Sequence, residues 1–224
     1  MWRNLILMVA LFGAVQFPLL AAEPAGEGRM VYMKTAYHTT FQAYLAGPED
    51  SPYGALLVHD RWGFNNQVLR WADKLAGLGY RVVAIDYFDG RMVRNKTMAR
   101  EVIKSIDPVW VEANLRAAVD YLARPGRRVV GVAWGQGAHH LASLTRQMPG
   151  ALSALVTYHQ RATAARDTSR RLNIPLLEVV SDRSLLDPGE YEDSARIRKE
   201  TWTATVKFLD TNFKAAGKQA LLAE

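Results

Sequence analysis

Along the chain, short apolar runs alternate with segments whose apolar positions recur at helical spacing. Residues 39–45 alternate between apolar and polar positions with a period of two, as expected of a half-buried strand. The later apolar runs are continuous, which is typical of strands covered on both faces of a parallel sheet. They cover residues 55–59, 81–86, 128–134, 152–158 and 174–180. Because helical segments separate them, the pattern predicts a doubly wound α/β sheet.

The helices are predicted from capping residues and from the spacing of apolar positions. Asn65 or Asn66 caps the first helix and Gly79 ends it. Asp107 caps a later helix that has Pro108 at its first position and continues to residue 122. The other predicted helices cover residues 97–105, the segment from the Gly135–Gly137 turn to about residue 148, and residues 190–214. The last one has a single apolar face at i, i+4, i+7 and i+11, formed by Trp202, Val206, Leu209 and Phe213.

The first 22 residues have the order of a secretory signal peptide. Arg3 precedes an apolar run over residues 5–20, and the small residues Ala21 and Ala22 follow. The run is short for a membrane span and contains Pro18. We therefore expect cleavage near Ala22, a periplasmic or secreted protein without a membrane span, and one domain over residues 23–224.

Composition narrows the chemistry further. The chain has no cysteine, which excludes disulfides, a thiol nucleophile and a thiolate metal site. Without residues 1–22, 27 basic residues would face 22 acidic ones, a net charge of +5. No basic stripe interleaved with aromatic residues occurs, so binding to nucleic acid is not expected. No metal-ligand spacing is present either, and we expect neither a metal nor a cofactor.

The strongest chemical signal is the sequence Ala133-Trp134-Gly135-Gln136-Gly137, which joins a predicted strand to a predicted helix. A tight glycine-containing turn in this setting is typical of a nucleophile elbow, in which the central side chain attacks a carbonyl carbon. Gly135 occupies that central position and has no side chain. Shifting the motif by one residue would place Trp134 or Gln136 there, and neither is a nucleophile.

Several segments together resemble the dienelactone hydrolase family of the α/β-hydrolase superfamily. The segment 55–65 carries His59-Asp60-Arg61-Trp62-Gly63. The other similar segments are 41–48, 72–76, 79–80, 84–88, 153–158, 174–177 and 202–209. The resemblance covers most of residues 39–213, and it implies a three-layer α/β-hydrolase-like fold with a mostly parallel sheet.

The resemblance also implies a reaction, hydrolysis of lactones and related esters by a Cys or Ser, an Asp and a His. The family's nucleophile maps to Gly135. In the family an acidic residue contacts the nucleophile, and that residue maps to Asp60. The family's histidine follows a last strand, but only residues 181–189 separate the preceding strand from the final helix. A strand alone takes about five or six residues, so we expect the last strand and the histidine loop to be missing. No histidine follows His159, and Asp182 and Asp187 are alternative candidates for the third triad position.

Side chains that follow the carboxyl ends of the strands are candidate ligand-binding residues, because these ends meet at one edge of the sheet. The candidates are Asp60, Arg61, Trp62, Tyr87, Arg91, Gln136, His159 and Arg183. Trp62 could instead cover the core, and Asp60 could pair with a nearby arginine. Arg61, Arg91, Arg161 and Arg183 could together clamp a carboxylate or phosphate, or they are ordinary arginines of exposed loops. Of the adjacent His139 and His140, one is expected to be packed and the other exposed.

Two functions remain open from the sequence. The first is a catalytically degenerate exported protein that binds a small molecule, with anions among the candidates, or a periplasmic protein partner. The second is a weak carboxylic-ester or lactone hydrolase. In it, Asp60 and His159 would activate a water molecule, and the N–H groups of Arg61 and Gln136 would stabilise the oxyanion. General-base activation of water supplies about 10²–10⁴-fold acceleration.

Overall fold

In the computed structural model, residues 28–158, 163–179 and 195–214 are described. The strands are β1 (Arg29–Lys34), β2 (Thr40–Ala46), β3 (Tyr53–Val58), β4 (Arg81–Ile85), β5 (Arg128–Trp134), β6 (Ala154–Tyr158) and β7 (Leu176–Val179). The helices are α1 (Asn66–Gly77), α2 (Lys96–Ser105), α3 (Pro108–Leu122), α4 (Gly137–Gln147), α5 (Thr163–Leu172) and α6 (Ala195–Phe208), and α6 continues as the π-helix η3 (Leu209–Lys214).

The described strands form one sheet in the order β1-β2-β4-β3-β5-β6-β7. β1 and β2 pair antiparallel, β2 pairs antiparallel with β4, and the remaining neighbours are parallel. The predicted α/β-hydrolase-like fold with a mostly parallel sheet is confirmed. β7 is the edge of the described sheet. Residues 180–194, on which the predicted loss of a last strand and histidine loop depends, lie outside the described residues.

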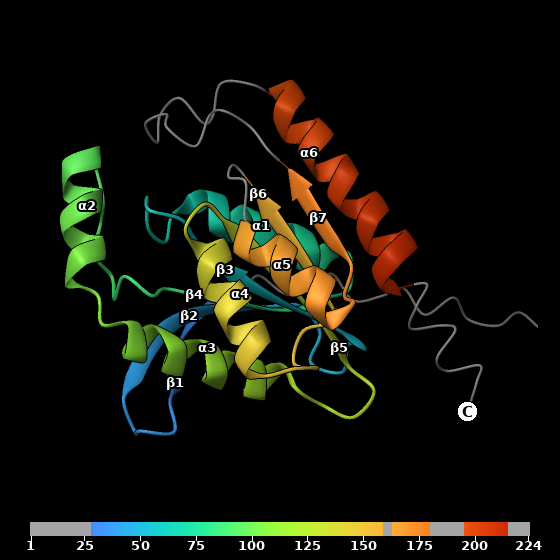
Figure 1. Cartoon of the computed structure of the whole chain (residues 1–224), viewed down its shortest axis with the longest axis horizontal. Coiled ribbons are helices and arrows are strands. Elements are labelled where there is room, and N and C mark those ends of the chain that lie inside the picture. The colour runs from blue at the N-terminus through green and yellow to red at the C-terminus, as the bar shows by residue number, and fades with distance from the viewer. Residues whose placement is uncertain (1–27, 159–162, 180–194, 215–224) are drawn as a thin grey trace, which may run out of the picture.

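The sheet is covered on both faces, which explains the continuous apolar runs (Figure 1). In β3, Leu56 and Val58 belong to the core cluster that also contains residues of α3, α4 and α5. Ala55 and Leu57 belong to the cluster with α1, α6 and η3. Alternate side chains of one strand therefore enter two separate cores, and every position of the strand is apolar.

The helix boundaries follow the predicted caps. Asn65 Oδ1 accepts hydrogen bonds from the N–H groups of Gln67 and Val68, so Asn65 is the N-cap of α1. Asp107 accepts one from the N–H of Val109 at the start of α3. Gly79, after the end of α1, has a φ of 85°, a left-handed conformation that glycine adopts without strain.

Two elements were not predicted, β1 and α5. In β1 only Val31 and Met33 are half-buried, and the strand is held by its pairing with β2. α5 is strongly polar, and Ala165 and Thr168 are its buried residues. Both elements lie at the margin of the core, where few positions need an apolar residue, so the sequence pattern is weak there.

Several predictions fall on residues that the structure does not describe. They are the signal segment 1–22 and the candidate residues His159, Arg161, Asp182, Arg183 and Asp187. Among the helices that are described, none has both the length and the apolar character that crossing a bilayer requires.

Candidate functional site

The nucleophile-elbow turn lies between β5 and α4. Gly135 has a φ of 46°, in the left-handed region that is strained for residues with a side chain. Its N–H donates a hydrogen bond to the carbonyl oxygen of Tyr158, at 3.0 Å. Gln136, half-buried, follows as the first residue of the helical turn and makes no side-chain capping bond. The backbone therefore has the strand–turn–helix geometry of a nucleophile elbow, with glycine at its central position.

Gly137 determines how closely α4 approaches the end of β3. A Cβ atom at Gly137 would lie 2.5 Å from the carbonyl oxygen of His59 and 2.6 Å from that of Val58. These distances are shorter than van der Waals contact, so only glycine fits. The close approach places the first turn of α4 against the segment that contains Asp60.

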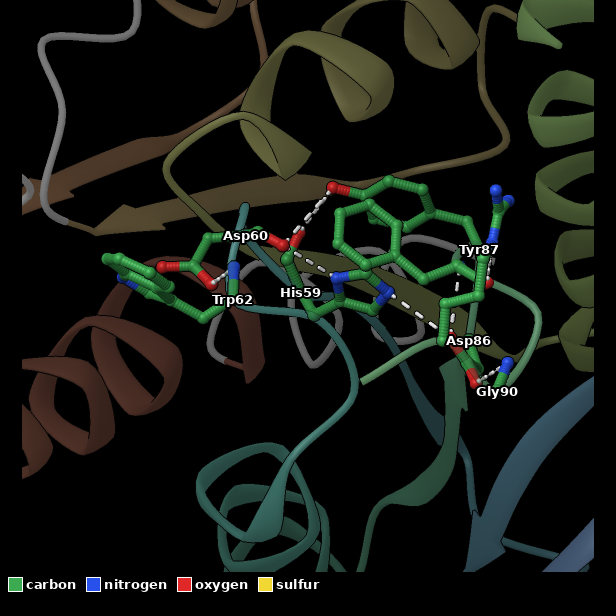
Figure 2. A network of polar contacts seen from close by, with 8 residues as sticks. His59, Asp60, Trp62, Asp86, Tyr87 and Gly90 are labelled. Atoms are coloured by element: carbon green, nitrogen blue, oxygen red, sulfur yellow. Dashed lines mark hydrogen bonds and ion pairs between the residues drawn. The ribbon is translucent and has the colours of Figure 1, made fainter. Parts of the chain in front are cut away.

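His59 is fully buried at the end of β3 and is held on three sides (Figure 2). Its ring stacks on Tyr87 with 3.9 Å between ring centroids and an interplanar angle of 6°. Nδ1 lies 2.8 Å from the carbonyl oxygen of Asp60, which can only accept, so Nδ1 is the donor. Nε2 lies 3.6 Å from Asp86 Oδ1, an ion-pair distance when the imidazole is protonated. The histidine thus links the ends of β3 and β4.

Asp86 organises the loop after β4. Its Oδ1 accepts a hydrogen bond from the N–H of Phe88 at 3.0 Å, and its Oδ2 accepts one from the N–H of Gly90 at 2.8 Å. Burial by itself would raise the pKa of this carboxyl group. The interaction with His59, together with the two N–H groups, outweighs burial and holds the pKa below its ordinary value. Asp86 is therefore a structural carboxylate.

Asp60 follows the end of β3, in the segment that Gly137 of α4 approaches. Its Oδ1 accepts one hydrogen bond, from the N–H of Trp62 at 2.9 Å. Although the residue as a whole is half-buried, burial raises the pKa of the carboxyl group, and Trp62, His59 and Arg61 offset this only in part. No ion pair between Asp60 and an arginine occurs among the described residues. The described residues therefore do not contain the arginine partner that the sequence offered as an alternative for Asp60.

Two of the candidate ligand-binding aromatics belong to the core. Tyr87 is 1% exposed, and its hydroxyl donates to the carbonyl oxygen of His59 at 3.2 Å. Burial, and then the charges of Asp60 and Asp86, raise its pKa well above the ordinary value, so it remains a neutral phenol. Trp62 is 5% exposed and packs in the core cluster, in line with the alternative that it covers the core. Tyr87 is thus a core residue rather than a side chain exposed for ligand binding, because the rings of His59 and His140 pack against it.

Arg91 has a structural role in the part of the chain that is described. Its Nε donates to the carbonyl oxygen of Phe88 at 2.7 Å, and its Nη1 donates to Ser105 Oγ at 2.7 Å. It therefore ties the loop after β4 to the end of α2. Arg161 and Arg183 lie outside the described residues, so Arg61 alone of the four predicted clamp arginines is left to line a cavity.

The structure adds residues to this region that sequence reasoning did not select. Arg61 lines a cavity of about 260 Å³ together with Lys96, Ala99, Arg100 and Ile103 of α2. One signal could have found them, because residues 91–104 hold five basic side chains and Glu101 as the single acidic one. No three histidine, aspartate or glutamate side chains within the described ranges are arranged to hold a metal ion.

The adjacent histidines of α4 divide as the sequence predicts. His139 is exposed, whereas His140 is half-buried with its ring 5.1 Å from that of Tyr87 in an edge-on arrangement. Burial, and then the charges of His59 and His139, lower the pKa of His140 to about 4. It is therefore neutral at physiological pH.

Comparisons with known proteins decide the family. The profile of the dienelactone hydrolase family matches residues 41–216. The chain belongs to the dienelactone hydrolase family. None of the curated protein sequences matches it significantly.

Solved structures agree with this assignment at the level of the fold. The chain named m3DLH is 22% identical with a TM-score of 0.65, and the match covers 83% of this chain and 98% of that one. A dienelactone hydrolase-like promiscuous phosphotriesterase from metagenomic libraries is 18% identical, with a TM-score of 0.60 and coverage of 84% and 99%. A dienelactone hydrolase from Anabaena variabilis is 13% identical, with a TM-score of 0.56 and coverage of 82% and 98%.

The lowered pKa of His140 predicts a pH dependence of stability in this family member. Between the unfolded pKa near 6.5 and the folded pKa of about 4, the unfolded state binds more protons, so stability falls as pH falls. The loss should reach about 2–3 kcal/mol. Asp60 acts oppositely, because its raised pKa makes the folded state bind more protons in part of this range.

The variant His140→Phe separates these contributions, because it keeps a ring against Tyr87 and removes the titration. Urea unfolding between pH 4 and 7 should show a weaker loss of stability toward low pH than in the wild type. His38→Asn is the control, since His38 is exposed and its φ of 63° suits asparagine. An unchanged pH profile in His140→Phe would contradict the assignment.

Proposed function

We propose that this protein is a catalytically degenerate member of the dienelactone hydrolase family that is exported and binds a ligand. The ligand is a small molecule, with anions as the leading class, or a protein partner in the periplasm. The observation that carries the proposal is Gly135, which has the left-handed backbone of the elbow and no side chain to form a covalent bond. The signal-like segment 1–22 supports export.

The surrounding residues support a binding role for the same edge of the sheet. His59 and Asp86 make local hydrogen bonds at the ends of β3 and β4, and their contact at 3.6 Å joins the two ends. His140 is neutral and packs on Tyr87, and no acid pairs with it among the described residues. These groups give the site a fixed shape, and none of them supplies a nucleophile.

A second candidate function is weak hydrolysis by an activated water molecule. The observation that favours it is Asp60, whose carboxyl group has a raised pKa and accepts one hydrogen bond from the chain. A carboxylate with a raised pKa is a better general base near neutral pH. Such an enzyme would gain about 10²–10⁴-fold from general-base catalysis and would form no covalent intermediate.

A combined labelling and turnover experiment separates these functions. The purified protein is incubated with a fluorophosphonate probe and with p-nitrophenyl acetate and a dienelactone. We expect no covalent adduct by intact mass, and ester turnover equal in wild type, Asp60→Asn and the surface control Asp120→Asn. Gly135→Cys introduces the sole thiol of the chain, so labelling of this variant by iodoacetamide reports whether the elbow is open to a reagent.

Each other outcome has a definite meaning. Turnover lost in Asp60→Asn or His159→Gln but kept in Asp120→Asn would establish the weak hydrolase and overturn the degenerate reading. A stoichiometric fluorophosphonate adduct of the wild type would exclude both functions. Removal of a nucleophile from a triad hydrolase costs about 10⁶-fold in kcat, so a preserved family-like rate would be detected easily.

A further inference from the structure

A small cavity separates α2 from the loop that follows β3. Its volume is about 260 Å³, and its lining residues are Arg61 from that loop and Lys96, Ala99, Arg100 and Ile103 from α2. The four α2 residues are spaced i, i+3, i+4 and i+7, so they form one face of the helix. Figure 1 shows α2 standing at the margin of the molecule, apart from α3 and α4.

The floor and the rim of the cavity differ in character. Ala99 is buried and Ile103 is half-buried, and both pack against the core cluster. Lys96 and Arg100 are exposed, and Arg61 is half-buried opposite them. Long basic side chains over an apolar floor keep their charged ends at the rim, where a ligand could reach the guanidinium groups of Arg61 and Arg100 together.

None of the described residues that line this cavity is acidic. Glu101, the acidic residue of α2, lies 3.1 Å from Lys104 Nζ and so pairs outside the lining set. Asp60 precedes Arg61, but its carboxyl group accepts the N–H of Trp62. The described lining residues therefore contribute positive charge, which favours an anion in proportion to the anion's charge.

The helix that carries two of these cations is fixed at both ends. Asn95 Oδ1 accepts the N–H of Met98 at 2.9 Å and caps the start of α2. Arg91 bonds Ser105 Oγ at the end of α2 and the carbonyl oxygen of Phe88 in the loop after β4. A cavity held in this way loses less freedom when a ligand binds, which favours affinity.

The geometry points to a binding site for the phosphate group of a small phosphate monoester, with Arg61 and Arg100 as its ligands. The two guanidinium groups can each make paired hydrogen bonds to phosphate oxygens. The volume is below the range of about 300–1,000 Å³ of sites for drug-sized ligands, so it suits a head group. The assignment rests on the proposed binding function, since Arg61 directly follows Asp60 in the chain.

Isothermal titration of the purified protein tests this site. The probes are inorganic phosphate, glycerol 3-phosphate and succinate at equal ionic strength. We expect saturable binding of both phosphates, with affinity reduced about tenfold or more in Arg61→Gln and in Arg100→Gln. Lys104→Gln removes the same charge from the same helix outside the cavity and should change the affinity less than about twofold. Thermal unfolding without phosphate checks that each variant is folded.

Three results would overturn the assignment. They are absence of saturable phosphate binding, equal weakening by Lys104→Gln, and succinate binding as tightly as glycerol 3-phosphate. The first would exclude the site, the second would indicate general charge attraction, and the third would make the ligand a carboxylate. Failure here leaves the labelling result untouched, whereas a fluorophosphonate adduct of the wild type would remove the proposed function even if phosphate binds.

Discussion

Replacement of Gly137 by alanine is expected to destabilise the protein by about 3–4 kcal/mol, the upper range for overpacking a closed site. The added Cβ would lie 2.5 Å from the carbonyl oxygen of His59 and 2.6 Å from that of Val58. Both are backbone atoms of β3 or of the segment just after it, and β3 pairs with β4 and β5. Neither atom can move aside without breaking the sheet, so α4 would have to shift.

Urea unfolding followed by circular dichroism measures this loss. Gly77→Ala is the matched control, because no atom lies within 4 Å of its added Cβ and Gly77 has no positive φ. At the end of α1 this change should be neutral or stabilising by up to about 1 kcal/mol. Equal unfolding free energies for the two alanine variants would show that the close approach of α4 to β3 is not real.

Replacement of Asp86 by asparagine should cost about 2–4 kcal/mol at pH 7, the penalty for disrupting a buried charged network. The carboxylate accepts the N–H groups of Phe88 and Gly90 and lies 3.6 Å from His59 Nε2. Asparagine offers one oxygen and one NH₂ group, so one of the two backbone N–H donors would face another donor.

The pH dependence of the Asp86→Asn effect has a definite sign. Because the folded pKa of Asp86 is lowered, its carboxylate stabilises the fold above the unfolded pKa, and this is lost as pH falls through the folded pKa. The stability difference between wild type and variant should therefore shrink below about pH 4. Asp120→Asn, at an exposed position of α3, removes the same charge and should change stability by less than about 0.5 kcal/mol. A similar loss in both variants would contradict a specific role for Asp86.

The sheet and most helices follow from local patterns. The runs in β3 and β5 are apolar at every buried position, because both faces of these strands are covered. Asn65 and Asp107 cap helices by bonds within three residues of sequence, which a sequence reading can foresee. β1 and α5 could not be predicted in the same way, since pairing with β2 and packing at the margin of the sheet hold them in place.

The candidate site shows the same division. Asp60, Arg61 and Gly135 were placed correctly at the ends of β3 and β5, because strand ends are readable from the sequence. The roles of Tyr87 and Arg91 could not be predicted from the sequence. The burial of Tyr87 and the hydrogen bond from Arg91 to Ser105 both depend on tertiary packing. Arg61 lines one cavity with Lys96 and Arg100, although these residues are 35 or more positions apart in the chain. Such a meeting of distant segments cannot be predicted from local patterns.

The sequence by itself determined the fold class, the family resemblance and the absence of a side chain at Gly135. These depend on periodicity, caps and residue identity, which are local properties of the chain. Only the tertiary structure decided that Gly135 has the left-handed conformation of an elbow, that His59 and Asp86 are structural, and that three cations surround one cavity. Those facts depend on the approach of α4 to β3 and of α2 to the loop after it, and such distances are set by packing between distant segments.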